Sequence, residues 1–467
     1  MTAPPLLLEF GTAAVMLVVF ALGLFGPKDD RRLAGIAATV GVFVLGAVAM
    51  VLSPSGAALG GMFVQDGLAI FAKRVFLAAT FIGVLAGLAS PPFVRRSAEY
   101  HTLILASLLG MLVLASARDV VLLFVAFELM SIPLYVLAGF AKREPESIEA
   151  SLKFFLVGSV SSAVMAYGLS FVYGATGSTS LAAIARAPLD PWLTLGLLAV
   201  LTGIGFKIAA FPFHMWVPDT YEAAWTPFVA WLSVAPKAAG FIALFRIYFE
   251  GAGERADAWG PATAALATVT MLAGNLMALP QKNAKRLLAY SGIAQIGYML
   301  VGIAAASASG TAMVLFYLVA YVFGNMGAFL VVEAVARAEG SESTSAFRGL
   351  AQRSPLLALA MLLFLLSLGG IPFVAGFWAK LYVFWAAAEQ GLYWLVLVGA
   401  ILTVVALFYY LVIARSMYIE APARQERVRV APALAVSVAL CVAGIVVIGV
   451  YPKPVVMAAL RVAAPLF

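Results

Sequence analysis

Long apolar runs alternate along the whole chain with short breaks that hold charged residues, proline or glycine. A helix needs about 20 apolar residues to cross a hydrocarbon core about 30 Å thick, so each run of this size predicts one transmembrane helix. Fourteen such runs can be marked, at residues 5–25, 33–53, 68–90, 100–117, 119–139, 148–174, 192–224, 226–249, 259–279, 286–306, 310–336, 355–388, 391–415 and 430–451. The pattern predicts an all-α integral membrane protein with about 14 transmembrane helices.

Two of these runs are too long for one plain helix. Residues 192–224 and 355–388 would each reach roughly 50 Å at 1.5 Å per residue. Pro212 and Pro218 interrupt the first run, and the segment 369–372 (Gly-Gly-Ile-Pro) interrupts the second, so both are predicted to be broken helices. A re-entrant loop or a kink without a function is the alternative explanation.

The two predicted broken helices are spans 7 and 12, five apart, so they run in opposite directions across the membrane. An odd offset is what two five-helix units of inverted topology produce, which predicts inverted repeats at spans 4–8 and 9–13. The expected organisation is an N-terminal three-helix segment at 1–99, a first five-helix repeat at 100–249, a second, inverted repeat at 259–415 and a C-terminal helix segment at 416–467.

Composition supports the membrane assignment and limits the chemistry. The 467 residues are 64% hydrophobic and 11% charged, against about 45–50% and about 25% in soluble domains. One cysteine, Cys441, and two histidines, His101 and His214, are too few for a disulfide framework, a zinc site, a cysteine-ligated iron–sulfur cluster or a bis-histidine haem. We therefore expect no cofactor, metal or redox centre within this chain.

Basic residues in the breaks alternate between the two sides of the predicted membrane. Seventeen lysines and arginines lie in the loops after odd-numbered spans or, as Arg286 and Arg415 do, at the span ends that border these loops, and five lie in the other loops and the termini. Because positive loops stay in the cytoplasm, both termini are predicted to be non-cytoplasmic. The net charge of +7 thus lies in short loops facing lipid head groups, and no nucleic-acid partner is expected. The 32 Phe and 8 Trp are interpreted as lipid contacts and interfacial belts rather than a ligand cage.

Several charged residues lie inside predicted spans, where each costs about 2.5–3.5 kcal/mol. Four of them are candidates for proton transfer: Glu128 in span 5, Lys207 beside the break of span 7, Lys237 in span 8 and Lys380 past the break of span 12. A lysine in a low-dielectric site can load and release a proton when a carboxylate approaches and withdraws. The alternative for each is a structural role, such as a buried pair that only orients helices.

For the remaining polar residues of the spans, a role without proton transfer is a stronger alternative. Lys153 and His214 are candidates for accessory relay positions. Lys153 follows Glu149 by four residues, so a local ion pair or a side chain reaching the interface is also open. His214 can equally be an ordinary hydrogen-bonded residue, and Lys73 and Arg74 are interpreted as marking a membrane interface.

Five segments carry a resemblance to a known family: 205–227 (GFKIAAFPFHMWVPDTYEAAWTP), 123–137 (LFVAFELMSIPLYVL), 149–155 (EASLKFF), 286–300 (RLLAYSGIAQIGYML) and 367–384 (SLGGIPFVAGFWAKLYVF). They resemble the antiporter-like membrane subunits of respiratory complex I, most of all the subunit N type. Lysine at 380 argues against the subunit M type, and FHMWVPDTYE argues against the subunit L type and the antiporter-complex relatives. One departure is EAAWTP, where the family more often has a Gly-Ala-Pro-Thr-Pro turn.

The resemblance implies a proton-pumping membrane subunit of an NADH:quinone oxidoreductase. In that family the span 5 glutamate pairs with the span 7 lysine, which maps onto Glu128 and Lys207. Lys237 would be the central protonatable residue, and Lys380 would lead to the other side. Flavin and iron–sulfur clusters are then expected in partner membrane and peripheral subunits, and quinone elsewhere in the complex. The expected location is a bacterial inner membrane.

Two other functions stay open. The chain could be a subunit of a cation/proton antiporter or of a ferredoxin- or hydrogenase-coupled relative. It could also be a free-standing secondary transporter with a small-molecule site at its broken helices.

Overall fold

The computed structural model describes residues 4–26, 32–54, 56–89, 96–188, 190–251, 256–422 and 424–467. Within these ranges thirteen helices are long and apolar enough to cross a membrane. The predicted all-α membrane architecture is therefore confirmed. The chain forms two compact units, and their ranges are Met1–Ala209, Ala235–Ala256 and Pro465–Phe467 for unit 1, and Ala210–Val234 and Asp257–Ala464 for unit 2.

Unit 1 is a helical bundle with one small hairpin. Its helices are α1 (Leu7–Phe25), α2 (Leu33–Val51), α3 (Gly67–Gly87), α5 (Ser97–Ser116), α6 (Val120–Ala138), α7 (Pro145–Thr176), α8 (Leu181–Arg186), α9 (Pro191–Ile208) and α12 (Ala235–Phe245). The π-helix Arg246–Gly251 continues α12, and strands β1 (Gly56–Ala58) and β2 (Phe63–Gln65) pair antiparallel around the 3-10 turn Leu59–Gly61.

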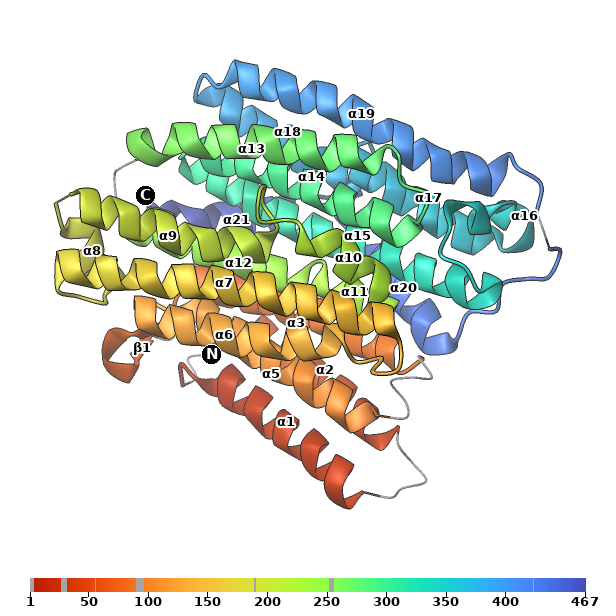
Figure 1. Cartoon of the computed structure of the whole chain (residues 1–467), viewed down its shortest axis with the longest axis horizontal. Helices are drawn as coiled ribbons and strands as arrows, with labels where there is room; N and C mark the ends of the chain where they lie inside the picture. Colours follow the sequence, from red (N-terminus) through yellow and green to blue (C-terminus); the bar gives the residue numbers. More distant parts are fainter. Residues whose placement is uncertain are drawn as a thin grey trace. The chain divides into compact units, whose positions relative to one another are not determined.

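Three helices of unit 1 start where an acidic side chain caps the free backbone N–H groups. Asp66, Asp119 and Asp190 accept such bonds at the starts of α3, α6 and α9. Figure 1 shows α6, α7 and α9 running alongside one another. Gly168 of α7 and Gly196 of α9 allow this close approach, because a Cβ at Gly168 would lie 2.7 Å from the Gly196 carbonyl oxygen.

Unit 2 is a second helical bundle. Its elements are α10 (Trp216–Ala223), α11 (Thr226–Leu232), α13 (Ala256–Ala278), α14 (Ala284–Ala304), α15 (Ala308–Glu339), the 3-10 turn Thr344–Phe347, α16 (Leu350–Arg353), α17 (Pro355–Gly369), α18 (Ala375–Glu389), α19 (Tyr393–Tyr418), α20 (Pro432–Val450) and α21 (Lys453–Ala463). The 3-10 turn Ala464–Leu466 follows α21, and its residues from Pro465 on belong to unit 1. Helix α15 is its core and contacts α11, α14, α17, α18, α20 and α21. Helix α15 is 32 residues long, which corresponds to about 48 Å at 1.5 Å per residue.

The two overlong runs are each divided between two helices. Helix α9 ends at Ile208 and α10 begins at Trp216, with Ala209 left-handed at a φ of 63°. Helix α17 ends at Gly369 and α18 begins at Ala375, with Gly370 at a φ of 79°. Span 8 is also interrupted, between the end of α11 at Leu232 and the start of α12, which the sequence pattern did not predict.

Lys73 and Arg74 of α3 both have polar partners within unit 1. The Lys73 ammonium of α3 lies 2.8 Å from the Glu9 carboxylate of α1 and donates to Gln65 at 2.9 Å. Arg74 donates to the carbonyls of Ala49 and Leu52 at 2.9 Å. These carbonyls lie at the end of α2, where the helix itself supplies no N–H partner. Lys73 is thus wholly buried inside unit 1.

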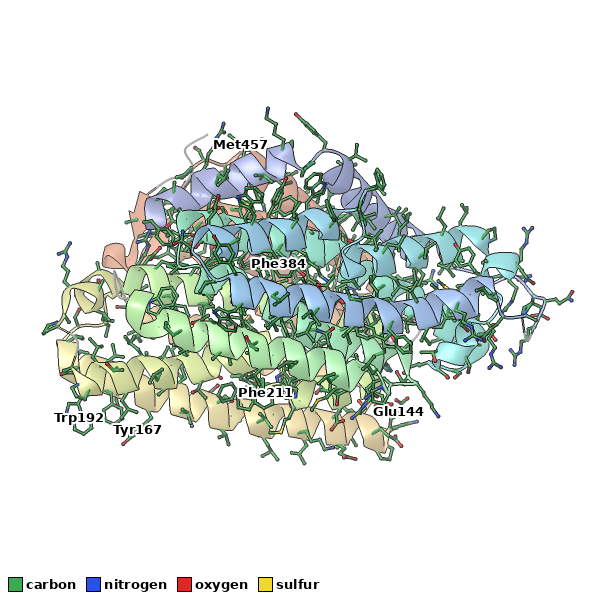
Figure 2. The ribbon with its side chains drawn as sticks, turned by 90° about the horizontal axis from the view of Figure 1, so that it is seen from above. Glu144, Tyr167, Trp192, Phe211, Phe384 and Met457 are labelled. Atoms are coloured by element: carbon green, nitrogen blue, oxygen red, sulfur yellow. The ribbon has the colours of Figure 1, made fainter. Side chains whose placement is uncertain are left out.

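Large aromatic side chains project from one end of unit 1. Figure 2 shows Tyr167 of α7 and Trp192 of α9 pointing outward there, and both are more than half exposed. Phe171 stacks on Trp192, with ring centroids 5.6 Å apart. Exposed Tyr and Trp side chains of this kind are typical of the membrane–water interface.

Candidate functional site

Lys207 lies in the last turn of α9, and its ammonium is enclosed by aromatic rings. The Nζ atom lies 5.2–5.8 Å from four ring centroids, those of Phe127, Tyr135, Phe154 and Phe206. It makes no hydrogen bond to a described residue. Ring faces within about 6 Å attract a cation, which offsets part of the cost of burying it. The cage contradicts the interpretation of the aromatic residues as lipid and interface contacts only.

Glu128 lies on α6, half-buried, in the same unit as Lys207. Its carboxylate accepts a hydrogen bond of 2.5 Å from Ser162 of α7. Among the described residues it makes no ion pair, so the expected contact with Lys207 is not formed in this structure. Tyr135, seven residues further along α6, is buried, and its ring is one wall of the cage around Lys207. In this structure Glu128 is therefore held by Ser162, and Lys207 is held by the surrounding aromatic rings.

Lys237 is buried at the start of α12, directly after Pro236. Proline has no backbone N–H, which is consistent with its place at the start of a helix beside the interruption after Leu232. Helices α9 and α12 are in contact. A Cβ at Gly240 would lie 2.6 Å from Ile208 and 3.5 Å from the Lys207 side chain. Glycine at 240 thus lets the helix of Lys237 approach the helix of Lys207.

Lys380 belongs to α18, but its side chain reaches back to the break after α17. Its ammonium lies 3.5 Å from the Gly369 carbonyl oxygen and 4.4 Å from the centroid of the Tyr298 ring. The carbonyls that end a helix carry partial negative charge and favour a cation. The helix break and the aromatic face therefore form a buried cation site.

Polar side chains continue from Lys380 through unit 2. Asn275 donates to the Tyr298 hydroxyl at 3.3 Å, and Tyr409 donates to Asn275 at 3.0 Å. A second group has Gln295 at its centre. Its amide donates to Tyr410 at 3.2 Å and accepts from Tyr317 at 2.5 Å. All these side chains are buried, so they form a polar interior in an apolar bundle.

The two accessory candidates differ in their surroundings. Lys153 on α7 forms an ion pair of 2.8 Å with Glu149, and its side chain is 48% exposed. This is the local pair that the sequence left open. His214 lies in the segment that follows α9 and precedes α10 along the chain; it is buried, and its ring stacks on Phe211 at a centroid distance of 5.4 Å.

Arg246 is a fully buried charge with several partners at the end of α12. It donates to both oxygens of Asp66, to the Ala115 carbonyl at 2.7 Å and to Glu250. Arg118 pairs with Asp66 at 2.6 Å and with Glu250 at 3.1 Å. Burial opposes ionisation of Asp66, but the charge and hydrogen bonds of Arg246 outweigh it and hold the pKa of this carboxyl below its usual range. The cluster fixes the helix that carries Lys237.

A second ionic cluster holds the turn whose sequence departs from the family pattern. Lys285 donates to the Ala224 carbonyl and to Glu342, both at 2.8 Å. Arg286 pairs with Asp219 at 2.8 Å and with Glu222 at 2.7 Å. Helix α10 is therefore tied to the start of α14 despite the altered residues at 223–227.

Sequence reasoning missed the aromatic cage and the polar interior of unit 2. The residues of the cage and of the polar interior come from several helices, far apart in the sequence. Which of these side chains come into contact depends on how the helices pack. Asn275 and Gln295 could have been found, because each is an uncharged polar side chain inside a predicted span. No group of three or more His, Cys, Asp or Glu side chains able to hold a metal ion occurs among the residues that the structure describes.

Comparison with known proteins identifies relatives over the full chain. The family described as "NADH:quinone oxidoreductase/Mrp antiporter, TM" matches residues 117–406. NADH-quinone oxidoreductase subunit N of Moorella thermoacetica is 41% identical over 99% of this chain and 98% of the relative.

Two solved structures match the whole fold. A chain of respiratory complex I from Thermus thermophilus with bound aureothin is 33% identical, with a TM-score of 0.84 over 97% of this chain and 99% of that chain. A chain of the archaeal membrane-bound sulfane sulfur reductase is 26% identical, with a TM-score of 0.90 over 99% of this chain and 97% of that chain. The chain therefore belongs to the NADH:quinone oxidoreductase/Mrp antiporter transmembrane family, in which its sequence groups with the relatives named subunit N.

Proposed function

We propose that the chain is the subunit N type, proton-translocating membrane subunit of an NADH:quinone oxidoreductase. The observation that carries the proposal is the set of three buried lysines at helix ends and interruptions, Lys207, Lys237 and Lys380, in a chain 41% identical to a protein of that name. Three buried lysines cost roughly 8–10 kcal/mol by insertion scales. The aromatic rings around Lys207 and the Gly369 carbonyl beside Lys380 offset only part of the cost of burying those two side chains, which supports a proton-carrying function for them.

Glu128, Lys207, Lys237 and Lys380 form the proposed proton path. Glu128 exchanges between Ser162 and the Lys207 ammonium, and its approach favours the charged lysine. Its return to Ser162 leaves Lys207 with aromatic rings alone, which favours release of the proton to Lys237 through the contact of α9 with α12. Lys380 and the polar interior of unit 2 then carry the proton onward. Lys153 and His214 are accessory relays, and Lys153 must first leave Glu149.

The redox chemistry belongs to partner subunits. Flavin, iron–sulfur clusters and quinone would reside in other subunits of the complex, and electron transfer there would drive the Glu128 exchange. Arg246 and its acidic partners have a supporting role, because they hold α12 in place while Lys237 changes its charge.

We also propose that the chain contains two inverted five-helix repeats. Pairs of elements 163 or 164 residues apart support this: α7 and α15 are each 32 residues long and end at left-handed glycines, Gly177 and Gly340. In each proposed repeat a glycine permits a close helix crossing. A Cβ at Gly110 would overlap the Met130 backbone nitrogen, and a Cβ at Gly274 would overlap that of Ala294.

The proposed location is a bacterial inner membrane with both termini on the non-cytoplasmic side. Reporter domains fused after residue 142 and at the C-terminus are expected on opposite sides of the membrane, because the positive loops stay in the cytoplasm. Alkaline phosphatase and green fluorescent protein fusions at each site provide the measurement. Reporters on the same side would contradict the span count.

Co-purification tests the function as a whole. The tagged chain, extracted in mild detergent, is expected to migrate with a large assembly that contains flavin and iron–sulfur clusters and reduces quinone with NADH. An assembly that lacks NADH oxidation would instead favour the relatives coupled to other electron donors. Recovery as a monomer or homo-oligomer would favour a free-standing transporter.

A further inference from the structure

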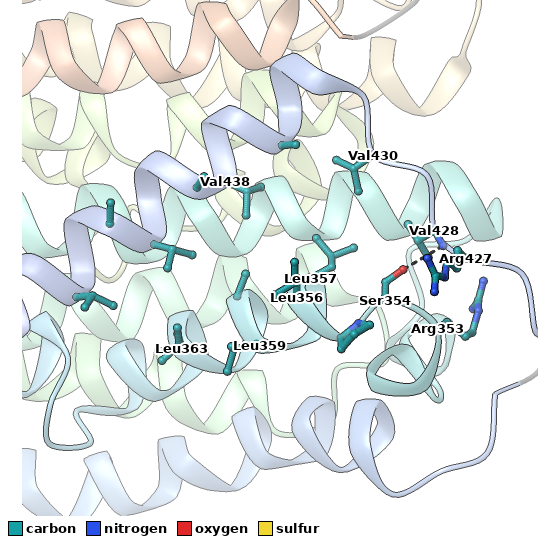
Figure 3. A pocket seen from close by; sticks show the side chains of 17 residues that line it. Arg353, Ser354, Leu356, Leu357, Leu359, Leu363, Arg427, Val428, Val430 and Val438 are labelled. Carbon is teal, nitrogen blue, oxygen red and sulfur yellow. Dashed lines mark hydrogen bonds between the residues drawn. The ribbon is translucent and has the colours of Figure 1, made fainter.

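An apolar groove runs between α17 and α20 in unit 2, with a volume of about 820 Å³. Figure 3 shows Leu356, Leu359 and Leu363 of α17 on one wall and Val438 of α20 on the other. The depth comes from small side chains on one face of α20, at Ala435, Ala439 and Ala443. From Pro355 to Leu363 and from Ala435 to Val446 the lining holds no charged group.

The length of the groove matches one leaflet of a bilayer. Residues 435 to 446 of α20 extend over about 17 Å at 1.5 Å per residue. Half of a hydrocarbon core about 30 Å thick is about 15 Å. One end of the groove therefore lies near the membrane centre when the other end lies at the head groups.

The head-group end of the groove opens into a basic cavity of about 840 Å³. The two cavities share Arg353, Arg427 and Val428 in their linings. The basic cavity is lined by five arginines and a single acid, Glu426; the arginines are Arg337, Arg353, Arg424, Arg427 and Arg429. The apolar groove, which suits an acyl chain, thus joins a basic cavity, which suits an anionic head group.

The arginines that line the basic cavity have two different roles. Arg353 is structural, because it pairs with Glu339 at 2.7 Å and donates to the Glu426 carbonyl at 2.8 Å. The Ser354 hydroxyl accepts from the Val428 N–H at 3.1 Å and fixes the mouth of the groove (Figure 3). Arg424, Arg427 and Arg429 are exposed and form no ion pair with a described residue. These three side chains remain available to an anion.

We propose that this groove binds one anionic phospholipid, with an acyl chain between α17 and α20 and the phosphodiester on Arg424, Arg427 and Arg429. Arginine donors match phosphate oxygens in a bidentate geometry, and basic pockets between transmembrane helices select anionic head groups. The three arginines belong to the loop between the last two predicted spans, on the side predicted to be cytoplasmic. The groove, its charge and its depth all fit a lipid of that leaflet.

Photolabelling tests the proposal in membranes that contain the full chain. Phosphatidylglycerol with a diazirine in its acyl chain is added, the sample is irradiated, and the tagged chain is purified and mapped by mass spectrometry. Adducts are expected on α17 between residues 355 and 363 and on α20 between residues 435 and 446. The triple variant R424Q, R427Q, R429Q should lower their yield by about tenfold or more, because it removes three cations from the head-group site.

Two further variants separate the head group from the acyl chain. Ala439→Phe fills the groove while keeping every arginine, and it should also abolish the adducts. Arg143→Gln removes an exposed arginine that does not line either cavity, and it should leave the yield unchanged. Equal labelling by a phosphatidylcholine analogue, or an undiminished yield in the triple variant, would overturn the proposal. Absence of adducts on both segments in the unaltered chain would overturn it as well.

Discussion

Lys237→Arg is expected to leave the chain folded and assembled but to lower proton translocation through it by about tenfold or more. A positioned group that gives and takes a proton contributes about 10²–10⁴ to a rate, and arginine cannot do this because it stays protonated. Lys237 is buried on a helix in contact with that of Lys207, so a permanent charge there would block the transfer. Quinone reduction and membrane energisation are measured together in vesicles.

The matched control is Lys282→Arg, a lysine-to-arginine change at an exposed loop position. It should leave translocation at the wild-type level. Lys237→Ala should impair translocation as Lys237→Arg does, because neither side chain can exchange a proton near neutral pH. Wild-type pumping in Lys237→Arg, in a complex shown to be fully assembled, would contradict this prediction. The central proton-transfer role would then belong to Lys207 or Lys380.

Glu128→Gln is expected to reduce pumping strongly while assembly is kept. The amide can still bond to Ser162, so local packing is preserved, but it cannot bring a negative charge to Lys207. Lys207→Met should be similarly impaired, because it removes the ammonium from the aromatic cage. If the two groups act as a pair, the double variant should be little worse than either single variant, with a coupling free energy of about 0.5–3 kcal/mol.

Glu146→Gln is the control for this pair, since Glu146 is an exposed glutamate near the start of α7. It should not change pumping. Ser162→Ala should have a smaller effect than Glu128→Gln, because it removes one resting partner and keeps the carboxylate. A double variant whose loss equals the sum of the two single losses would show that Glu128 and Lys207 act independently.

The amino-acid sequence by itself determined the class of the protein and the residues worth testing. Apolar runs must become helices in lipid, because each backbone N–H and C=O then finds its partner within the same segment. Proline and glycine at 212, 369, 370 and 372 marked the helix interruptions for the same local reason. Lysines and a glutamate in apolar runs stood out because their burial is costly.

Only the tertiary structure decided what those charges touch. Phe127, Tyr135, Phe154 and Phe206 come from three helices, and their enclosure of Lys207 depends on how α6, α7 and α9 pack. Glu128 bonds to Ser162 rather than to Lys207. The spacing of residues along one helix does not show which of two nearby partners the carboxylate takes. The Lys380 site needs a carbonyl from the end of another helix. Contacts between distant segments follow from side-chain packing, and the apolar pattern that fixes each helix does not specify which of its faces meet.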